Sequence, residues 1–307
     1  VYYVPSQLLF RVALESLPLA DGSLLGDHYN FVRLSSAREL LGRKQAPKTY
    51  AAKTAVVYGG LNYDMDLLAM QEKAKQYDLS GLLAERGGLL RGDSVYRNLP
   101  GTEKEARAIA SSLRAEHWDV SLLSGNNGTE ESFLRLHGRA PRLLHIATHG
   151  FYYTPLEAAK VDYLKGYDDA MLLSGLVFSG CNHAWLGKPL PGGVLSGILQ
   201  AEDIARMDLR GTEMVVLSAC QTGQGRATAE GLYGLQRAFK KAGVGTIVMS
   251  LWAVKDKATQ DFMTAFYEHL LKNGVQSDKR KAFEVAKKVV REKYKEPYYW
   301  AAFVMLD

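Results

Sequence analysis

The chain has 307 residues, of which 47% are hydrophobic and 23% charged, and its formal net charge is +5. This composition is typical of a globular protein with enough length for a large core. Two cysteines are too few for a fold built on disulfides, and no apolar run approaches the roughly 20 residues of a membrane span. We therefore expect a cytoplasmic protein with no membrane partner.

The positive charge is densest in residues 278–296, "DKRKAFEVAKKVVREKYKE". Phe283, Ala286 and Val290 recur there at helical spacing, and the Lys and Arg side chains fill the other face beside glutamates. We interpret this cluster as the solvated face of a helix. No recognised nucleic-acid-binding motif accompanies it, so we expect no direct binding of nucleic acid.

The first 53 residues hold short mixed strands and the helical stretch "SSARELLG", followed by the connection "RKQAPKTYAAK". The chain begins at Val1 without a methionine, and its start lacks the pattern of a signal peptide. We therefore expect a piece of a longer protein with a part missing upstream. Residues 1–53 are interpreted as an N-terminal segment that leads into a main domain of residues 54–307.

The main domain opens on residues 54–60, "TAVVYGG", whose β-branched apolar run predicts a buried strand. Next, "GTEKEARAIASSLRAEH" predicts a helix, with Thr102 and Glu105 as a capping box. Thr129 is expected to cap a short helix, and Gly243 to end a longer one. Further strands are predicted at residues 119–125, 142–150, 211–220, 245–252 and 299–306.

Strands alternate with helices along this domain, and each strand is a continuous apolar run. That pattern predicts an α/β sandwich with a mostly parallel sheet covered by helices on both faces. In such sheets, functional residues gather at the carboxyl ends of the strands. His149 and Cys220 both follow predicted strands at such ends, each next to a turn.

A metal site is one candidate, because His145 and His149 are four residues apart in "HIATH". The β-branched neighbours predict a strand, in which four residues span about 13 Å. Zinc ligands each lie about 2 Å from the ion, so the two histidines cannot share one. We expect no metal.

Two other possibilities concern nucleotides and a disulfide. The segment "SGCNHAWLGKP" differs from a phosphate-binding loop in its glycine spacing, and a proline follows Lys188 where Ser or Thr is needed. We therefore expect no nucleotide and no other cofactor. Cys181 could form a disulfide with Cys220, but we favour the interpretation of Cys181 as a small buried or partly buried residue.

A cysteine–histidine pair is the remaining candidate. A thiolate nucleophile needs a nearby base and adjacent N–H groups that stabilise the developing oxyanion. His149 precedes Gly150, and Cys220 precedes a loop with Gly223 and Gly225, so both backbones leave room for a substrate. The pair requires the two strands to be neighbours. On spacing alone, a core cysteine and an unrelated core histidine explain the same residues.

The segments "LLHIATHGFYY" and "MVVLSACQTGQG" resemble the His and Cys boxes of CHAT proteases, the caspase- and separase-like cysteine peptidases of many bacterial proteins. Other segments resemble blocks of the same family in the same order: "RLSSAREL", "LPGTEKEA", "SGLVFSGCNHAW", "EGLYGLQRAFKKAGVGTIVMSLWAVKDKAT" and "PYYWAAFVML". The resemblance covers nearly the whole chain.

The resemblance implies a caspase-like three-layer α/β/α sandwich and a cysteine endopeptidase that cleaves a protein or peptide substrate. His149 would be the general base and Cys220 the nucleophile. The N–H groups of Gly150 and Cys220 would form the oxyanion hole. Gln221 stands where the family pattern has an acidic residue, a departure that alters the local charge and leaves the dyad in place.

The resemblance also places the specificity pocket after the strand "GTIVMSLW", with Trp252 and Asp256 as candidate substrate-binding residues. An Asp256 carboxylate in a pocket would favour cleavage after Arg or Lys. Two alternatives stay open. Asp256 could instead cap the helix that begins near Lys257, or Trp252 could hold an apolar substrate residue.

CHAT domains often follow helical repeats, commonly tetratricopeptide repeats, so the resemblance implies a repeat region upstream that binds a partner and regulates the protease. An alternative function is a catalytically silent caspase-like scaffold. The presence of both His149 and Cys220 favours the protease, because a scaffold has no physical need for either residue.

Overall fold

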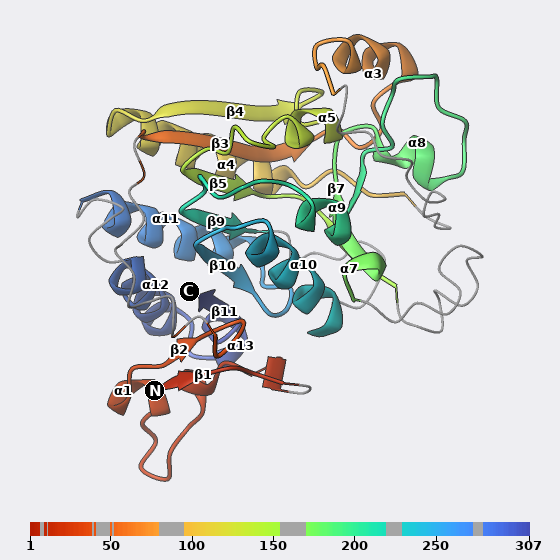
Figure 1. Ribbon diagram of the computed structural model, residues 1–307. Coiled ribbons are helices and arrows are strands. Elements are labelled where there is room, and N and C mark those ends of the chain that lie inside the picture. Colours follow the sequence, from red (N-terminus) through yellow and green to blue (C-terminus); the bar gives the residue numbers. More distant parts are fainter. Residues whose placement is uncertain are drawn as a thin grey trace.

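The computed structural model describes residues 1–6, 9–10, 12–38, 40, 50, 52–79, 95–153, 170–218, 229–272 and 279–307. Within these residues an eight-stranded sheet forms the centre (Figure 1). Adjacent strands are parallel except β10 and β11, which are antiparallel. Their order across the sheet is β1 (Tyr2–Tyr3), β2 (Val32–Arg33), β11 (Phe303–Leu306), β10 (Thr246–Ser250), β9 (Met214–Leu217), β5 (Leu143–Ile146), β3 (Thr54–Leu61) and β4 (Asp119–Gly125).

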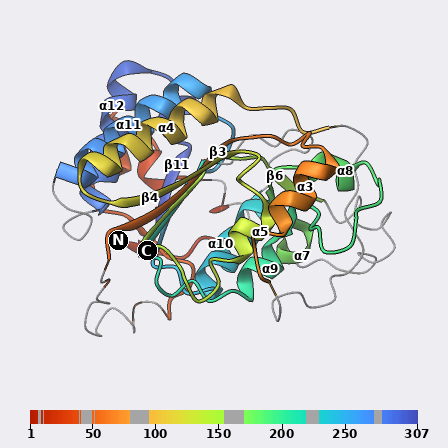
Figure 2. The same cartoon turned by 90° about the horizontal axis from the view of Figure 1, so that it is seen from above.

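Helices cover both faces of the sheet, as Figure 2 shows from above. One face carries α4 (Pro100–Ala115), α11 (Asp256–Lys272) and α12 (Lys279–Lys293); the other carries α5 (Glu130–Leu134), α9 (Ala201–Ala205) and α10 (Ala229–Lys241). Each central strand divides its apolar side chains between the two layers. In β9, Met214 and Val216 pack under α4 and α11, whereas Val215 and Leu217 pack under α10.

A second, smaller sheet continues from the end of β5. It joins β6 (Gly150–Tyr152), β7 (Ser174–Val177) and β8 (Ile198–Gln200) in antiparallel order. Nearby lie α3 (Leu67–Ala74), α7 (Ala170–Leu173) and α8 (Cys181–Trp185). The chain therefore passes from the large sheet to the small one through residues 147–149, which places His149 at the junction.

The N-terminal segment adds its strands to the large sheet. In β2, Arg33 pairs with Leu306 of β11, and β1 pairs with β2 at the outer side. The short helices η2 (Leu14–Ser16) and α1 (Leu25–His28) belong to this segment, which lies near α12 and α13 (Pro297–Trp300). In the part of the chain that the structure describes, no helix is both long and apolar enough to cross a membrane.

Several local predictions are confirmed. The expected strands at 54–60 and 119–125 are β3 and β4. The hydroxyl of Thr129 accepts the N–H of Ser132 at 3.2 Å and caps α5. Gly243 follows α10 with a φ of +99°, a conformation that favours glycine after a helix.

Other local predictions were wrong. The predicted capping box does not form, because α4 begins at Pro100, where the flanking Leu99 offers no side-chain cap. The Thr102 hydroxyl instead donates to the Leu99 carbonyl at 2.7 Å and accepts the N–H of Gly60 at 3.0 Å. Glu105 is turned inward. The strand expected at 142–150 ends at Ile146, and α13 takes the first residues of the strand expected at 299–306.

Candidate active site

The strands that lead to His149 and Cys220 are direct neighbours. β5 pairs with β9 in parallel, with Ile146 opposite Leu217. His149 follows Ile146 by three residues, and Cys220 follows Leu217 by three residues in the sequence. Cys220 itself lies outside the described residues, as does Gln221. The two strands that precede His149 and Cys220 are thus neighbours, as a dyad requires, and their carboxyl ends lie at the same edge of the sheet.

His149 is 3% exposed, and a backbone carbonyl orients its ring. Nε2 lies 2.7 Å from the carbonyl oxygen of Arg97. Because a carbonyl only accepts, Nε2 carries the hydrogen, and in the neutral ring Nδ1 then carries the lone pair. The ring also lies beside two tyrosines, with centroid distances of 5.0 Å to Tyr63 and 5.3 Å to Tyr96.

The Arg97 carbonyl is itself held in place through its neighbour Tyr96. The Asn182 side chain accepts the N–H of Tyr96 at 2.7 Å and donates to the Tyr96 carbonyl at 2.9 Å. Its amide nitrogen also donates to Asp64 at 2.7 Å. Asn182 is 2% exposed, so this clamp is shielded from water.

A second chain of hydrogen bonds fixes the backbone of His149. The N–H of His149 donates to the hydroxyl of Tyr63. That hydroxyl lies 2.9 Å from the hydroxyl of Thr148, which donates to the carbonyl of Val177 at 2.6 Å. Because Thr148 uses its hydrogen on Val177, Tyr63 is the donor to Thr148. Burial raises the pKa of Tyr63 well above its usual value, which keeps that hydrogen in place.

The N–H of Gly150 is directed away from β7. The Val177 N–H donates to the His149 carbonyl at 3.1 Å, and the Tyr153 N–H donates to the Leu173 carbonyl at 2.8 Å. In an antiparallel pair, hydrogen-bonded and non-hydrogen-bonded residues alternate. Residues 149 and 153 are hydrogen-bonded to β7 or its flanking residues. Gly150, which lies opposite Leu176, therefore belongs to the non-hydrogen-bonded residues of this strand. Its N–H therefore points away from β7, toward the side of β6 that pairs with no other strand among the described residues.

Asp256 lines a cavity of about 70 Å³ at the carboxyl ends of β9 and β10. Ser218, Ser250 and the first turn of α4 share the lining. A Cβ on Gly101 would lie 2.9 Å from the Asp256 Oδ2 atom, so the glycine leaves room for the carboxylate. α11 begins at Asp256 itself, and the Lys255 carbonyl accepts the N–H of Thr259 at 3.1 Å. Lys255 thus occupies the N-cap position of this helix.

Trp252 lies beside this region without joining the lining of the Asp256 cavity. Its indole Nε1 donates to the carbonyl of Tyr298 at 2.9 Å, which ties the segment after β10 to α13. The side chain is half-buried against both apolar layers. The two residues predicted to bind substrate therefore have different surroundings.

The other histidine of "HIATH" serves the core. His145 is fully buried; its Nδ1 lies 3.1 Å from the Tyr267 hydroxyl and its Nε2 lies 3.1 Å from Glu105. Among the described residues, no group of three or more His, Cys, Asp or Glu side chains is arranged to hold a metal ion.

Cys181 is a free, fully buried thiol at the start of α8. Burial raises its pKa well above the usual value, and the Coulomb repulsion of Asp64 adds to the shift. A thiol that stays protonated is a poor nucleophile. Its environment fits the interpretation of Cys181 as a small core residue.

Sequence reasoning missed Arg97, Asn182 and Tyr63. Arg97 contributes a backbone carbonyl, which every residue has, so no sequence signal could have identified it. Asn182 and Tyr63 act on segments that are far away in the sequence; Asn182, for example, is 86 positions from Tyr96. The polar Asn182 directly after Cys181, in the largely apolar segment "SGLVFSGCNHAW", was the one available hint.

Taken together, these observations define an α/β protein with a mostly parallel central sheet, in which His149 lies just beyond the carboxyl end of β5. Residues 1–307 match the family described as "CHAT domain". The chain belongs to the CHAT domain family.

Relatives with known sequences are much longer than this chain. "Tetratricopeptide repeat protein 28" of Mus musculus is 38% identical over 112 residues, which is 36% of this chain and 4% of that protein. The Homo sapiens protein of the same name is 35% identical over 111 residues, again 36% of this chain and 4% of that protein. The matched segment thus spans a small fraction of each relative.

Among solved structures, the fold is similar to that of "the Arg specific cysteine proteinase gingipain R". The TM-score is 0.50 and the identity 12%, over 92% of this chain and 56% of that one. This likeness concerns the fold alone. It agrees with the mostly parallel central sheet described above.

Proposed function

We propose that this chain is a cysteine endopeptidase in which His149 is the general base and Cys220 the nucleophile. The observation that carries the proposal is the parallel register of β5 and β9, with Ile146 opposite Leu217. In both cases the candidate catalytic residue follows the last paired residue of its strand by three positions in the sequence. Strand ends in such a pair leave the sheet together, which favours a short distance between the two side chains.

The contacts of His149 support its role as the base. The Arg97 carbonyl accepts the Nε2 hydrogen and leaves Nδ1 to take the thiol proton of Cys220. When the ring becomes a cation, the same carbonyl stabilises it through a charge-assisted hydrogen bond. The buried Asn182 clamp on Tyr96 keeps that acceptor in position.

The proposed reaction follows from these positions. The Cys220 thiolate attacks the carbonyl carbon of the scissile peptide, and the electron pair of the C=O bond moves to oxygen. The N–H groups of Gly150 and Cys220 donate to this oxyanion. Collapse expels the amine, which takes the proton from His149 and leaves a thioester. Water then gives a proton to His149, attacks the thioester and restores the thiol.

Asp256 is proposed to select a substrate Arg or Lys before the scissile bond. Its carboxylate lines a cavity at the carboxyl ends of β9 and β10, together with Ser218, which is two residues before Cys220. A basic side chain would supply the opposite charge. The competing proposal is an apolar substrate residue held against Trp252.

The wider setting is also a proposal. The named relatives are tetratricopeptide repeat proteins, so we place this domain beside helical repeats that bind a partner and regulate cleavage of a protein substrate. Residues 54–307 would be the protease domain, and residues 1–53 would lead into it. The free Cys181 thiol agrees with a reducing compartment such as the cytoplasm.

Labelling with an affinity probe tests the dyad directly. A biotinylated peptide acyloxymethyl ketone with Arg at its reactive end is incubated with the wild-type chain, Cys220→Ala and Cys181→Ala. We expect rapid labelling of wild type and Cys181→Ala, and none of Cys220→Ala. If Cys220 reacts no faster than an ordinary exposed thiol, the scaffold alternative is the better account. Because helical repeats are proposed to regulate the site, the full-length protein is tested in parallel.

A further inference from the structure

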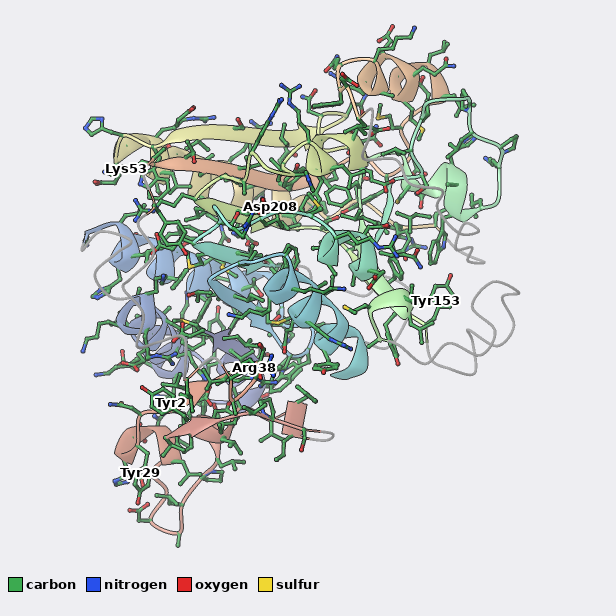
Figure 3. The ribbon with its side chains drawn as sticks, in the orientation of Figure 1. Tyr2, Tyr29, Arg38, Lys53, Tyr153 and Asp208 are labelled. Carbon is green, nitrogen blue, oxygen red and sulfur yellow. The ribbon has the colours of Figure 1, made fainter. Side chains whose placement is uncertain are left out.

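A second cavity, of about 340 Å³, lies between the N-terminal segment and α12. It shares no lining residue with the Asp256 cavity. β2 and β11 contribute Arg33, Val304 and Met305, one wall comes from residues 15–31, and the other comes from α12. Figure 3 shows Tyr29, which belongs to the first wall, at the end of the molecule that carries β1 and α1.

Buried hydrogen-bond donors without acceptors gather around this cavity. Arg33 is 2% exposed and Trp300 is 4% exposed, and both line the cavity. Among the described residues, Arg33 Nε, Arg33 Nη1 and Trp300 Nε1 are buried and have no hydrogen-bond partner. All three atoms can only donate. Buried donors are normally satisfied, so their concentration at one cavity points to a missing acceptor.

Arg33 also has no ion pair of its own, unlike its neighbours. Its Nη2 donates to the carbonyl of Phe10 at 3.0 Å, and the guanidinium bonds to the hydroxyl of Tyr3. In the described part of the chain no carboxylate lies within ion-pair distance of it; Glu15 attracts it from farther away but is already paired with Lys287. The buried or half-buried cations nearby are all paired: Lys287 with Glu15 at 3.0 Å, Arg291 with Asp27 at 2.8 Å and Arg280 with Asp307. The remaining charged lining residues, Glu284 and Lys288, are exposed.

A buried charge without a partner is costly, and burial accordingly lowers the pKa of Arg33. An anion in the cavity would relieve that cost and supply acceptors to the unsatisfied donors. Since one buried cation lacks a partner, a single negative charge matches it best. Aromatic side chains supply the rest of the surface, among them Tyr29, Phe31 and Phe283.

We infer that this cavity binds a small molecule in which one carboxylate is attached to an apolar or aromatic body. The carboxylate accepts from Arg33 and Trp300, and the body packs against the aromatic lining. The cavity volume lies at the small end of the range for ligand pockets. The site is independent of the proposed protease centre.

Ligand-observed NMR with matched pairs tests the inference. Benzoate, phenylacetate and 3-phenylpropionate are each compared with their neutral amide, using the full chain. We expect at least one carboxylate to bind at least tenfold more tightly than its amide. Arg33→Met should abolish this preference while leaving the fold intact, because it removes a buried charge that has no ion pair. Circular dichroism and thermal melting check the fold of each variant.

Two further variants sharpen the test. Trp300→Phe removes one donor, keeps the aromatic bulk and should weaken carboxylate binding several-fold. Lys288→Met is the matched control, because Lys288 lines the cavity with a side chain that is 77% exposed; its binding should stay within twofold of wild type. Equal binding of carboxylates and amides overturns the inference. Unchanged carboxylate binding in Arg33→Met overturns it as well, and Cys220→Ala should bind like wild type whatever the outcome for the protease.

Discussion

The two histidines of "HIATH" lie in different surroundings, one in the core and one at the candidate site, although they are four residues apart in the chain. His145 is 0% exposed and His149 is 3% exposed, so burial does not distinguish them. His145 lies within β5, where the side chains of Glu105 and Tyr267 approach its two nitrogens. His149 lies beyond the strand end, and a backbone carbonyl orients its ring.

The difference shows what separates a structural histidine from a candidate base. Within the strand, the side chain must point into one of the two apolar layers, where Tyr267 of α11 and Glu105 of α4 each lie 3.1 Å from one of its nitrogens. Beyond the strand, residues 147–149 lead into β6, and the neighbouring strand β9 ends three positions before Cys220. The predictions below test this contrast, from the largest expected effect to the smallest.

His149→Ala and Cys220→Ala should each abolish peptide cleavage, with losses on the order of a thousandfold or more, because nucleophile and base act as a unit. Cys220→Ala removes one sulfur and should change stability by about 1 kcal/mol or less. Steady-state cleavage of a peptide library and urea denaturation measure the two effects. Turnover of more than a few per cent in Cys220→Ala would show that another residue is the nucleophile.

His145→Leu should show the opposite profile. It leaves the buried Glu105 carboxylate without its partner, which should cost about 3 kcal/mol of unfolding free energy. Cleavage per folded molecule should stay within a few-fold of wild type. The double variant Glu105→Leu/His145→Leu removes both polar groups and should recover part of the stability, as measured by urea denaturation. A folded His145→Leu protein without activity would refute the division into core and site.

Asp256→Ala tests specificity at the site region. Asp256 is exposed in the free chain. If a bound substrate buries this carboxylate against its own cation, cleavage after Arg or Lys should fall about a hundredfold, on the order of 2–3 kcal/mol. Cleavage after apolar residues should change little. Trp252→Ala is the comparison variant, because Trp252 does not line the Asp256 cavity. If Trp252→Ala alone changes the residue preference, the apolar alternative is correct.

Much of the fold followed from the sequence, because long apolar runs with glycine stops have few alternatives. The strands β3, β4, β9 and β10 were predicted in this way, and so was a mostly parallel sheet covered on both faces. The family resemblance is confirmed by the match over residues 1–307. The small sheet was missed, because β6 and β8 have only three residues each and show no periodicity.

The surroundings of the site were less predictable. The pattern of Thr102 and Glu105 matches a capping box, yet Glu105 lies instead beside the buried His145, which is 40 positions further along the chain. The contact between Glu105 and His145 thus outweighs the local preference of the sequence for a capping box. The Arg97 carbonyl and the Asn182 clamp arise from segments that meet only in the folded chain. The roles of His149, Gly150, Cys220, Trp252 and Asp256 stay predictions.

Asn182→Ala should have an intermediate effect on the site region. The variant leaves the N–H and carbonyl of Tyr96 without their partners and loosens the Arg97 carbonyl. We expect kcat for cleavage to fall about tenfold, since a displaced acceptor misaligns the base. Alkylation by iodoacetamide over a range of pH gives a separate readout, in which the apparent pKa of Cys220 should rise. A loss of stability with an unchanged alkylation profile would mean that Asn182 is only structural.

Cys181→Ala should have the smallest effect on activity, although Cys181 is one of only two cysteines. Its thiol is fully buried, and burial raises its pKa, so it is protonated at neutral pH and out of reach of a substrate. Gly197 packs closely against the start of α8, since a Cβ on Gly197 would lie 3.0 Å from the Cys181 Cβ, and the alanine variant keeps this contact. Removing the sulfur should cost about 1 kcal/mol through the small void, while kcat/KM stays within twofold. A large loss of cleavage in a folded Cys181→Ala protein would mean that the nucleophile is Cys181 at the start of α8 and not Cys220.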